Sequence, residues 1–221
     1  RHFVPRGLRL FVDYLDLQPG FVGRIDFIHA INITQLFEIV CSAQDEFPTA
    51  ETRWCPEALT MTYENNRVRW QDKKYITRDD CAVSHQVWEN KCQHPITLEL
   101  AVAPEQCTVS RTKAGHYLAK TPTTAYDFAV GFAVGSDSGL EQQALTLAPG
   151  ETAEFTIVAA AGNLMTETEE QVVDKLEEKL EKPAQLWEEH QRVYQSFFEE
   201  APVFHSSDAL LNQTWNYRWY I

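Results

Sequence analysis

The residues best suited to chemistry gather near the C-terminus, in one expected helix. They are Asn212, Trp215, Tyr217, Arg218 and Trp219. Flat Trp and Tyr rings can stack on the C–H faces of sugars, and arginine donates paired hydrogen bonds to hydroxyl or carboxylate oxygens. Residues three or four apart share a helix face, so Asn212, Trp215 and Trp219 are expected to point together. Two interpretations stay open: these residues contact a sugar, or the tryptophans belong to a core and Arg218 to a buried ion pair.

A second group of side chains has the types that bind zinc. Cys81, His85, Cys92 and His94 lie within fourteen positions, but their spacing matches no standard zinc module. In a strand, Cys81 and His85 would share an otherwise apolar face. A packed cysteine and a hydrogen-bonded core histidine explain the pattern, so we expect no metal and no cofactor.

Two neighbouring pairs contain catalytic residue types. Asp79 and Asp80 are expected to point apart in a turn, and Ser84 and His85 to lie on opposite strand faces. Glycoside hydrolysis needs two carboxyl groups at a controlled separation, which nothing in the sequence fixes. Phosphate-loop, Gly-x-Ser-x-Gly and His-Glu-x-x-His motifs are absent. We therefore assign no catalytic residue to the chain.

Short strands must position these groups over residues 1–165. A two-residue period marks residues 8–15, and residues 24–42 are rich in β-branched and aromatic types, although 35–40 could also form a short helix. Residues 48–56 are expected to form a loop, and residues 58–70 a hairpin that turns at Asn65-Asn66. Further strands are expected at 74–77, 81–88, 96–102, 117–120, 126–134 and 154–160. About ten short strands indicate a mainly β fold, an antiparallel β-sandwich.

Helical periodicity begins after Gly162-Asn163. Thr166 and Glu169 have capping-box spacing, and Val172, Leu176 and Leu180 form one apolar stripe. Pro183 should break or restart the helix, and a second helix should run to about residue 200. We expect three parts: the sandwich (1–165), a helical linker (166–201) and the first helix of a further domain (202–221).

That last helix lacks a closing cap. Ser206, Ser207 and Asp208 favour its start, but no Gly, Pro or polar cap ends it. We expect it to open a helical domain that this sequence does not complete.

The amino-acid composition limits the classes of binding partner and the cellular compartment. A net charge of −13 argues against nucleic acid, and no apolar run is long enough to span a membrane. Five cysteines without close spacing favour reduced thiols, which slightly favours the cytoplasm. The glycosylation sequons at Asn32 and Asn212 leave secretion open.

The order of these parts resembles a known enzyme layout. A β-rich region, an acidic linker helix, an extended crossing and Leu211-Asn-x-x-Trp-x-Tyr-Arg-Trp219 resemble the start of the six-hairpin helical toroid of glycoside hydrolases. The relatives in question are of the trehalase, mannosylglycerate hydrolase and processing α-glucosidase type, with sugar phosphorylases further off. The layout covers nearly the whole chain, and only the short terminal motif is specific.

This resemblance implies an N-terminal β-supersandwich that braces a catalytic toroid. The parent enzyme would be a glycosidase acting on α-linked glucosides or related sugars by inversion. Its partners would be carbohydrate and the chain's own C-terminal toroid domain. The catalytic carboxylates would come from the toroid, so the present chain alone should be inactive.

Other functions also fit the sequence. A carbohydrate-binding sandwich without hydrolase activity would expose a coplanar aromatic row among Trp54, Trp70, Tyr75 and Trp88. The N-terminal domain of a sugar phosphorylase would need a phosphate site elsewhere in the protein. A purely structural scaffold is the remaining alternative.

Overall fold

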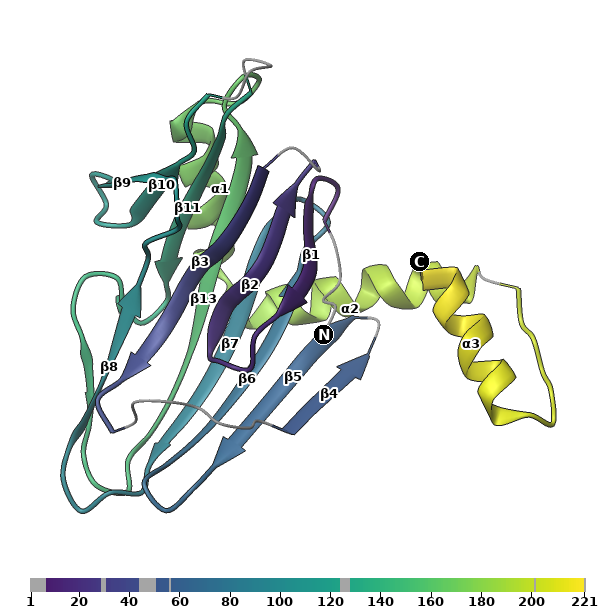
Figure 1. The fold of residues 1–221 in the computed structure, drawn as a ribbon, viewed down its shortest axis with the longest axis horizontal. Helices are drawn as coiled ribbons and strands as arrows, with labels where there is room; N and C mark the ends of the chain where they lie inside the picture. Colours follow the sequence, from purple (N-terminus) through teal and green to yellow (C-terminus); the bar gives the residue numbers. More distant parts are fainter. Residues whose placement is uncertain are drawn as a thin grey trace.

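The computed structural model describes residues 7–28, 31–43, 51–55, 57–123, 128–200 and 202–220, without the side chains of 216–220. Within these ranges, two antiparallel sheets pack face to face, and three helices come after them in the chain (Figure 1). The expected fold class, a mainly β antiparallel sandwich with C-terminal helices, is therefore confirmed. No helix of the described part is long and apolar enough to cross a membrane.

Among the described residues, the smaller sheet has five strands. In spatial order they are β1 (Leu10–Leu15), β2 (Gly20–Phe27), β3 (Ile31–Cys41), β8 (Ile96–Ala101) and β12 (Leu145–Leu147). Residues 35–40, for which a short helix was the alternative, lie within β3.

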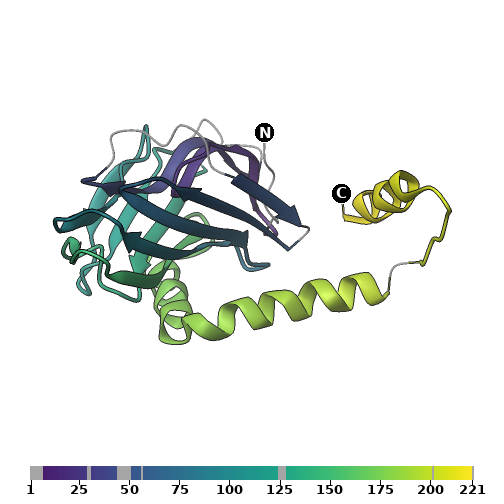
Figure 2. The same cartoon turned by 90° about the horizontal axis from the view of Figure 1, so that it is seen from below.

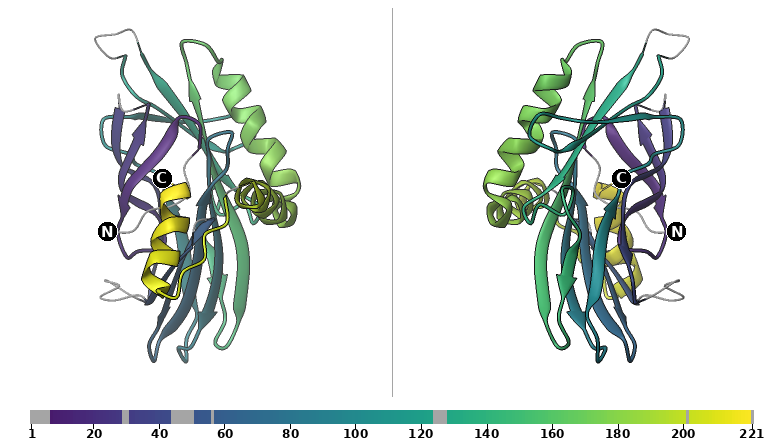
Figure 3. Two further views of the ribbon diagram at one scale, coloured as in Figure 1. Left: turned by 90° about the vertical axis from the view of Figure 1, so that its right-hand side faces the viewer. Right: turned by 90° about the vertical axis from the view of Figure 1, so that its left-hand side faces the viewer.

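In the part of the chain that the structure describes, the larger sheet has eight strands. In spatial order they are β4 (Glu51–Cys55), β5 (Ala58–Glu64), β6 (Val68–Ile76), β7 (Cys81–Asn90), β13 (Thr152–Asn163), β11 (Val130–Ser136), β10 (Tyr117–Lys120) and β9 (Thr108–Arg111). The strand β13 pairs with β7 on one side and β11 on the other. Figure 3 shows the two sheets as separate layers.

Alternation along the strands builds the main core between the sheets. In β7 Trp88 faces the smaller sheet, and its ring centroid lies 6.1 Å from that of Trp70 on β6. Alternate residues of β7, such as Val83, point to the opposite face of the larger sheet and belong to a second apolar cluster. Because both faces of the central strands are covered, β11 is buried along its whole length.

The helix α1 (Glu169–Glu181) covers the outer face of the larger sheet (Figure 3). Val172 and Leu176 are fully buried there, which confirms the predicted stripe. Burial of each such side chain stabilises the docking by roughly 1.5–3 kcal/mol. The predicted cap is wrong by two residues: Thr168 and Gln171 form the capping box. Thr166 instead donates to the Asn163 carbonyl.

The chain then turns sharply into α2 (Pro183–Glu199), as the proline predicted. Figure 2 shows α2 running below the sandwich and past its edge, and α3 (Ala209–Tyr220) lying apart from the sheets. The helix at the C-terminal end thus exists as expected. Its membership of a further domain stays a prediction, as does the division at residues 165 and 201.

Three strand predictions need correction. Residues 51–55 are not a loop but β4, because they pair in continuous register with β5; residues 48–50 and 56 lie outside the described part. Residues 74–77 are not a separate strand, since 74–76 end β6. The exposed β9 was missed, because it shows no buried face. The 58–70 hairpin is confirmed: Asn65 Oδ1 accepts from the N–H groups of Arg67 and Val68, both at 2.8 Å.

Candidate functional site

The predicted C-terminal site residues that can be placed make local contacts. Asn212 exchanges two hydrogen bonds with the main chain of Ser206, at 2.8 and 3.0 Å. Trp215 stacks on Phe204 with ring centroids 5.1 Å apart, and its Nε1 donates to the Pro202 carbonyl at 2.9 Å. Both residues hold the extended segment 202–208 against α3.

The side chains of Tyr217, Arg218 and Trp219 lie outside the described part of the structure. Whether Trp219 points the same way as Asn212 and Trp215 is therefore not tested. Sugar contact by Asn212, Trp215, Tyr217, Arg218 and Trp219 stays a prediction.

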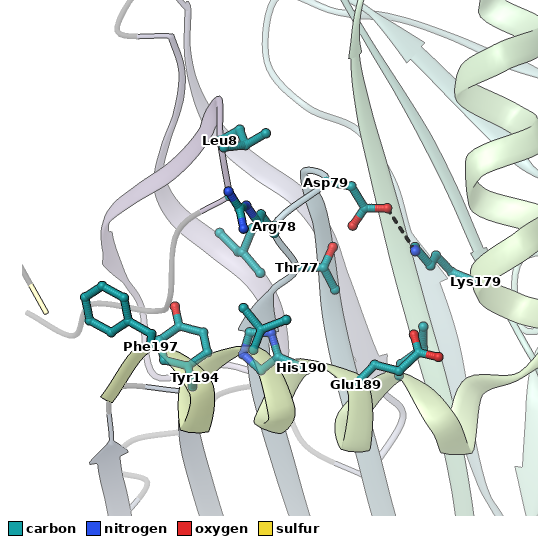
Figure 4. Close-up of a pocket in the computed structure, with 13 residues that line it drawn as sticks. Leu8, Thr77, Arg78, Asp79, Lys179, Glu189, His190, Tyr194 and Phe197 are labelled. Carbon is teal, nitrogen blue, oxygen red and sulfur yellow. Dashed lines mark ion pairs between the residues drawn. The ribbon is translucent and has the colours of Figure 1, made fainter. Parts of the chain in front are cut away.

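A cleft of about 510 Å³ lies between α2 and the turn that joins β6 to β7 (Figure 4). One wall is a face of α2 that carries Leu186, Glu189, His190, Val193, Tyr194 and Phe197. The opposite wall is the turn, with Arg78 and Asp79, together with Leu8 just before β1. We call this the α2 cleft.

One end of the α2 cleft is charged and closed by an ion pair. Lys179 Nζ of α1 lies 2.9 Å from Asp79 Oδ2. Burial would raise the pKa of Asp79, but the hydrogen bond and charge of Lys179 hold that pKa below its ordinary value. Asp79 is therefore a structural anion here and not a free acid or base.

Asp80 points away from its neighbour, as the turn interpretation predicted. Its buried carboxylate accepts from the main-chain N–H groups of Arg9 and Leu10, and Arg9 Nε lies 2.7 Å from its Oδ2. The two carboxylates thus share no proton site, and Asp80 ties the start of β1 to the β6–β7 turn.

His190 fixes α2 to the larger sheet at the centre of the α2 cleft. The side chain is 4% exposed, and its Nε2 lies 2.7 Å from the carbonyl oxygen of Glu57. Its ring packs between Tyr75 and Tyr194, with centroid distances of 4.6 and 4.9 Å. Burial lowers the pKa of His190 below 6.5, so the neutral ring donates to the carbonyl at neutral pH.

The other end of the α2 cleft is apolar and open. Val193 and Phe197 are 46% and 45% exposed, although they continue the stripe that buries Leu186. An apolar wall beside the ion pair of Asp79 and Lys179, whose charges cancel, suits the packing of another protein surface. It does not supply a free acid and base for catalysis.

Sequence reasoning placed the α2 residues in a helix stripe but did not identify the cleft. A usable signal was present: His190 lies four residues after Leu186 and four before Tyr194, so it is a polar residue on an apolar stripe. Such a residue must find a buried hydrogen-bond partner.

The four residues that could bind zinc have other partners or lie apart. Cys81 is buried in the apolar cluster under α1, where burial raises its pKa to about 12. Cys92 Sγ donates to the Arg67 carbonyl, His85 contacts Thr156 and Glu154, and His94 is exposed. Within the described ranges, no group of three or more His, Cys, Asp or Glu side chains is arranged to hold a metal ion.

The aromatic row that a carbohydrate-binding module would expose is not found. Trp70 and Trp88 are fully buried, Tyr75 is 2% exposed, and Trp54 is half-buried against the main core. This burial counts against that alternative in its simple form.

Comparison with known proteins gives the fold alone. No family model and no curated protein match the sequence. Among solved structures, the chain is similar to a polysaccharide lyase, with a TM-score of 0.45 and 13% identity, over 73% of this chain and 33% of that one. It is also similar to a putative kojibiose phosphorylase from the human microbiome, with a TM-score of 0.54 and 11% identity.

That second match covers 89% of this chain and 28% of the phosphorylase. The chain thus spans about a third or less of either protein. Most of the chain therefore shares its fold with one part of a much longer protein.

Proposed function

We propose that the chain is a non-catalytic N-terminal β-sandwich domain of a carbohydrate-active enzyme, and that it braces a catalytic helical domain. The observation that carries this proposal is a run of exposed apolar side chains on the second half of α2 and around α3. They are Val193 46%, Phe197 45%, Val203 79%, Phe204 39%, Leu210 69% and Leu211 51%. We call this set the apolar end.

The apolar end needs a partner surface. Soluble proteins rarely expose a large apolar patch without a binding role. A 12-residue helix such as α3 is also marginal by itself in water. Figure 1 shows that α2 extends beyond the sandwich, so a helical domain of the same polypeptide has room to pack against the apolar end and the α2 cleft.

The likeness to a putative kojibiose phosphorylase supports the sugar-related part of the proposal. Within that class we propose a glycosidase acting on α-linked glucosides by inversion, with catalytic carboxylates from the helical domain. A sugar phosphorylase is the second candidate, favoured by the same likeness over 89% of the chain. The two differ in whether water or phosphate attacks the sugar.

Activity assays on two proteins test this proposal. The natural polypeptide that contains this sequence and the 221-residue chain alone are each given maltose, trehalose and kojibiose, with and without inorganic phosphate. We expect activity from the natural polypeptide only. Release of a sugar phosphate in phosphate buffer identifies a phosphorylase, and release of free glucose alone identifies a glycosidase. Robust turnover by the 221-residue chain would overturn the non-catalytic role.

A paired substitution tests the bracing. Phe197→Ser should lower the melting temperature of the natural polypeptide but leave that of the 221-residue chain nearly unchanged, because Phe197 is 45% exposed and packs its ring on its chain neighbour Phe198. Val109→Ser on the edge strand β9 is the matched control and should change both proteins by the same amount. Equal effects of Phe197→Ser on both proteins would contradict docking at the apolar end.

A further inference from the structure

A second cleft, of about 440 Å³, opens on the outer face of the larger sheet beside the start of α2. Its described lining shares no residue with that of the α2 cleft. Lys73, His85 and Thr156 lie side by side on β6, β7 and β13, as the strand register requires. Asp137 comes directly after β11 and joins this row, because Thr156 N–H donates to its Oδ1 at 2.8 Å. We call this the sheet cleft.

The floor of the sheet cleft offers both donors and acceptors. His85 Nε2 lies 3.2 Å from Glu154 Oε1, and its Nδ1 lies 3.4 Å from Thr156 Oγ1. Because a carboxylate only accepts, Nε2 donates to Glu154, and in the neutral ring Nδ1 then accepts from the Thr156 hydroxyl. Glu154 is 67% exposed, so its carboxylate remains accessible to a ligand.

The roof of the sheet cleft is aromatic. Trp187 of α2 packs on Tyr75 with ring centroids 5.3 Å apart, and Lys73 Nζ lies 4.4 Å from the centre of the indole ring. A ligand with a flat C–H face can take the place of this ammonium group on the ring. Lys73 would then donate to the ligand from the side.

The charges around the sheet cleft nearly balance. Lys73 and the start of α2, where no described side chain caps the helix, supply positive charge. Asp137 and Glu154 supply negative charge. An anion would meet two carboxylates, and a cation would meet the ammonium and the helix end. A neutral ligand with many hydroxyl groups meets acceptors, donors and an aromatic face together, in a volume typical of small-molecule sites.

We propose that the sheet cleft binds a neutral saccharide, which stacks on Trp187 and hydrogen-bonds to Asp137, Glu154 and His85. This site would be independent of the catalytic domain and of the apolar end. It also differs from an exposed aromatic row, since one tryptophan and a row of polar side chains form it.

Titration of the 221-residue chain with maltose tests the proposal, by calorimetry and by the NMR signals of the indole and imidazole groups. We expect saturable binding that shifts the Trp187 and His85 signals. Glu154→Gln should weaken binding about tenfold, the value of one hydrogen bond to a charged acceptor. Glu99→Gln, on the exposed face of β8, is the matched control and should bind as the parent does.

Two further probes decide the ligand class. Glucuronate and inorganic phosphate should bind more weakly than maltose, because Asp137 and Glu154 oppose an anion. Tighter binding of either anion would overturn the proposal, and so would the absence of signal shifts with maltose at tens of millimolar or equal weakening by Glu99→Gln. Trp187→Phe keeps an aromatic ring packed on Tyr75, so α2 should stay folded. Weaker maltose binding by this variant would support stacking of the sugar on Trp187. Because the chain is titrated alone, these results do not depend on whether a helical domain exists.

Discussion

Lys74 and Asp72 form an ion pair sealed between the two sheets. Lys74 Nζ lies 3.3 Å from Asp72 Oδ2, and both side chains are fully buried. Asp72 also accepts from Gly20 N–H at 2.8 Å and Ser84 Oγ at 2.7 Å, while Lys74 donates to the Gln18 carbonyl at 2.7 Å. Burial lowers the pKa of Lys74 in spite of the neighbouring carboxylate. The pair thus links β2 of one sheet to β6 and β7 of the other.

Removing one partner of this pair should be more damaging than removing both. Asp72→Ala leaves Lys74 buried without its counter-charge and is expected to cost about 3–5 kcal/mol of unfolding free energy. The double substitution Asp72→Leu with Lys74→Met should cost clearly less, because no buried charge remains. Urea denaturation of the three proteins measures this. A double variant that loses as much unfolding free energy as Asp72→Ala would contradict it.

The corrected position of the first helix cap gives a second prediction. Thr168→Ala removes the hydroxyl that accepts from Gln171 N–H at 3.2 Å and should cost about 1 kcal/mol. Thr166→Ala, two residues earlier, should cost only a few tenths of that, since its hydroxyl lies outside the helix. Chemical denaturation of both variants decides between the two threonines. The reverse order would restore the cap expected from spacing alone.

Sequence patterns were reliable where burial sets the period. Alternation in residues 8–15 gave the right element, although a register shift after Val12 buries Leu15 and not Tyr14. The four-residue stripe of Val172 and Leu176 also gave the right element, because one face of the helix meets the sheet. They were less reliable at the edges of the sheet. The edge strand β4 and the edge strand β9 are mostly or fully exposed, so pairing with a neighbour and not burial makes them strands.

The clefts could not be predicted in the same way. Lys73, His85, Thr156 and Asp137 come from four separate stretches of the chain, and only strand register brings them together. The cap was misplaced for a related reason. Glu167 binds Arg9, which is distant in the sequence, and Lys175 of α1, and the helix begins only after Glu167.

Those contacts of Glu167 make the unfolding free energy depend on pH in the acidic range. Burial would raise the pKa of Glu167, but hydrogen bonds from Arg9 and the Asn163 N–H and the charge of Lys175 lower it to about 2. Since the ordinary value is 4.5, the unfolded chain takes up the proton first as pH falls. The stabilisation is therefore complete above pH 4.5 and is lost as the pH falls toward 2. Its upper bound is on the order of 3 kcal/mol.

Urea denaturation between pH 5 and 2.5 measures this loss. Glu167→Gln should be less stable than the parent at pH 5 and should show a shallower decline in acid. Glu105→Gln, in an exposed loop, is the control and should match the parent curve. Parallel decline of the parent and Glu167→Gln would show that other carboxylates govern the acid response.

His190 predicts a separate response at mildly acidic pH. Burial lowers its pKa below 6.5, so the unfolded chain binds a proton at a higher pH than the folded chain does. The stabilisation is present above pH 6.5 and is lost as the pH falls through the folded-state value. Around the ring lie the Glu57 carbonyl, Tyr75, Trp187 and Tyr194, with Glu189, Arg78 and Asp79 lining the same cleft.

A glutamine at this position can donate to the same carbonyl but does not titrate. Between pH 7.5 and 5.5 the parent should lose more unfolding free energy than His190→Gln does, because only the parent has a buried ring that must take up a proton. Hydrogen exchange should show the loss in α2 before the central strands, because His190 anchors that helix to the sheet. His94→Gln, at an exposed turn, is the matched control and should keep the parent's pH dependence. If His190→Gln also shows the pH dependence of the parent, protonation of His190 does not control the packing of α2 on the sandwich.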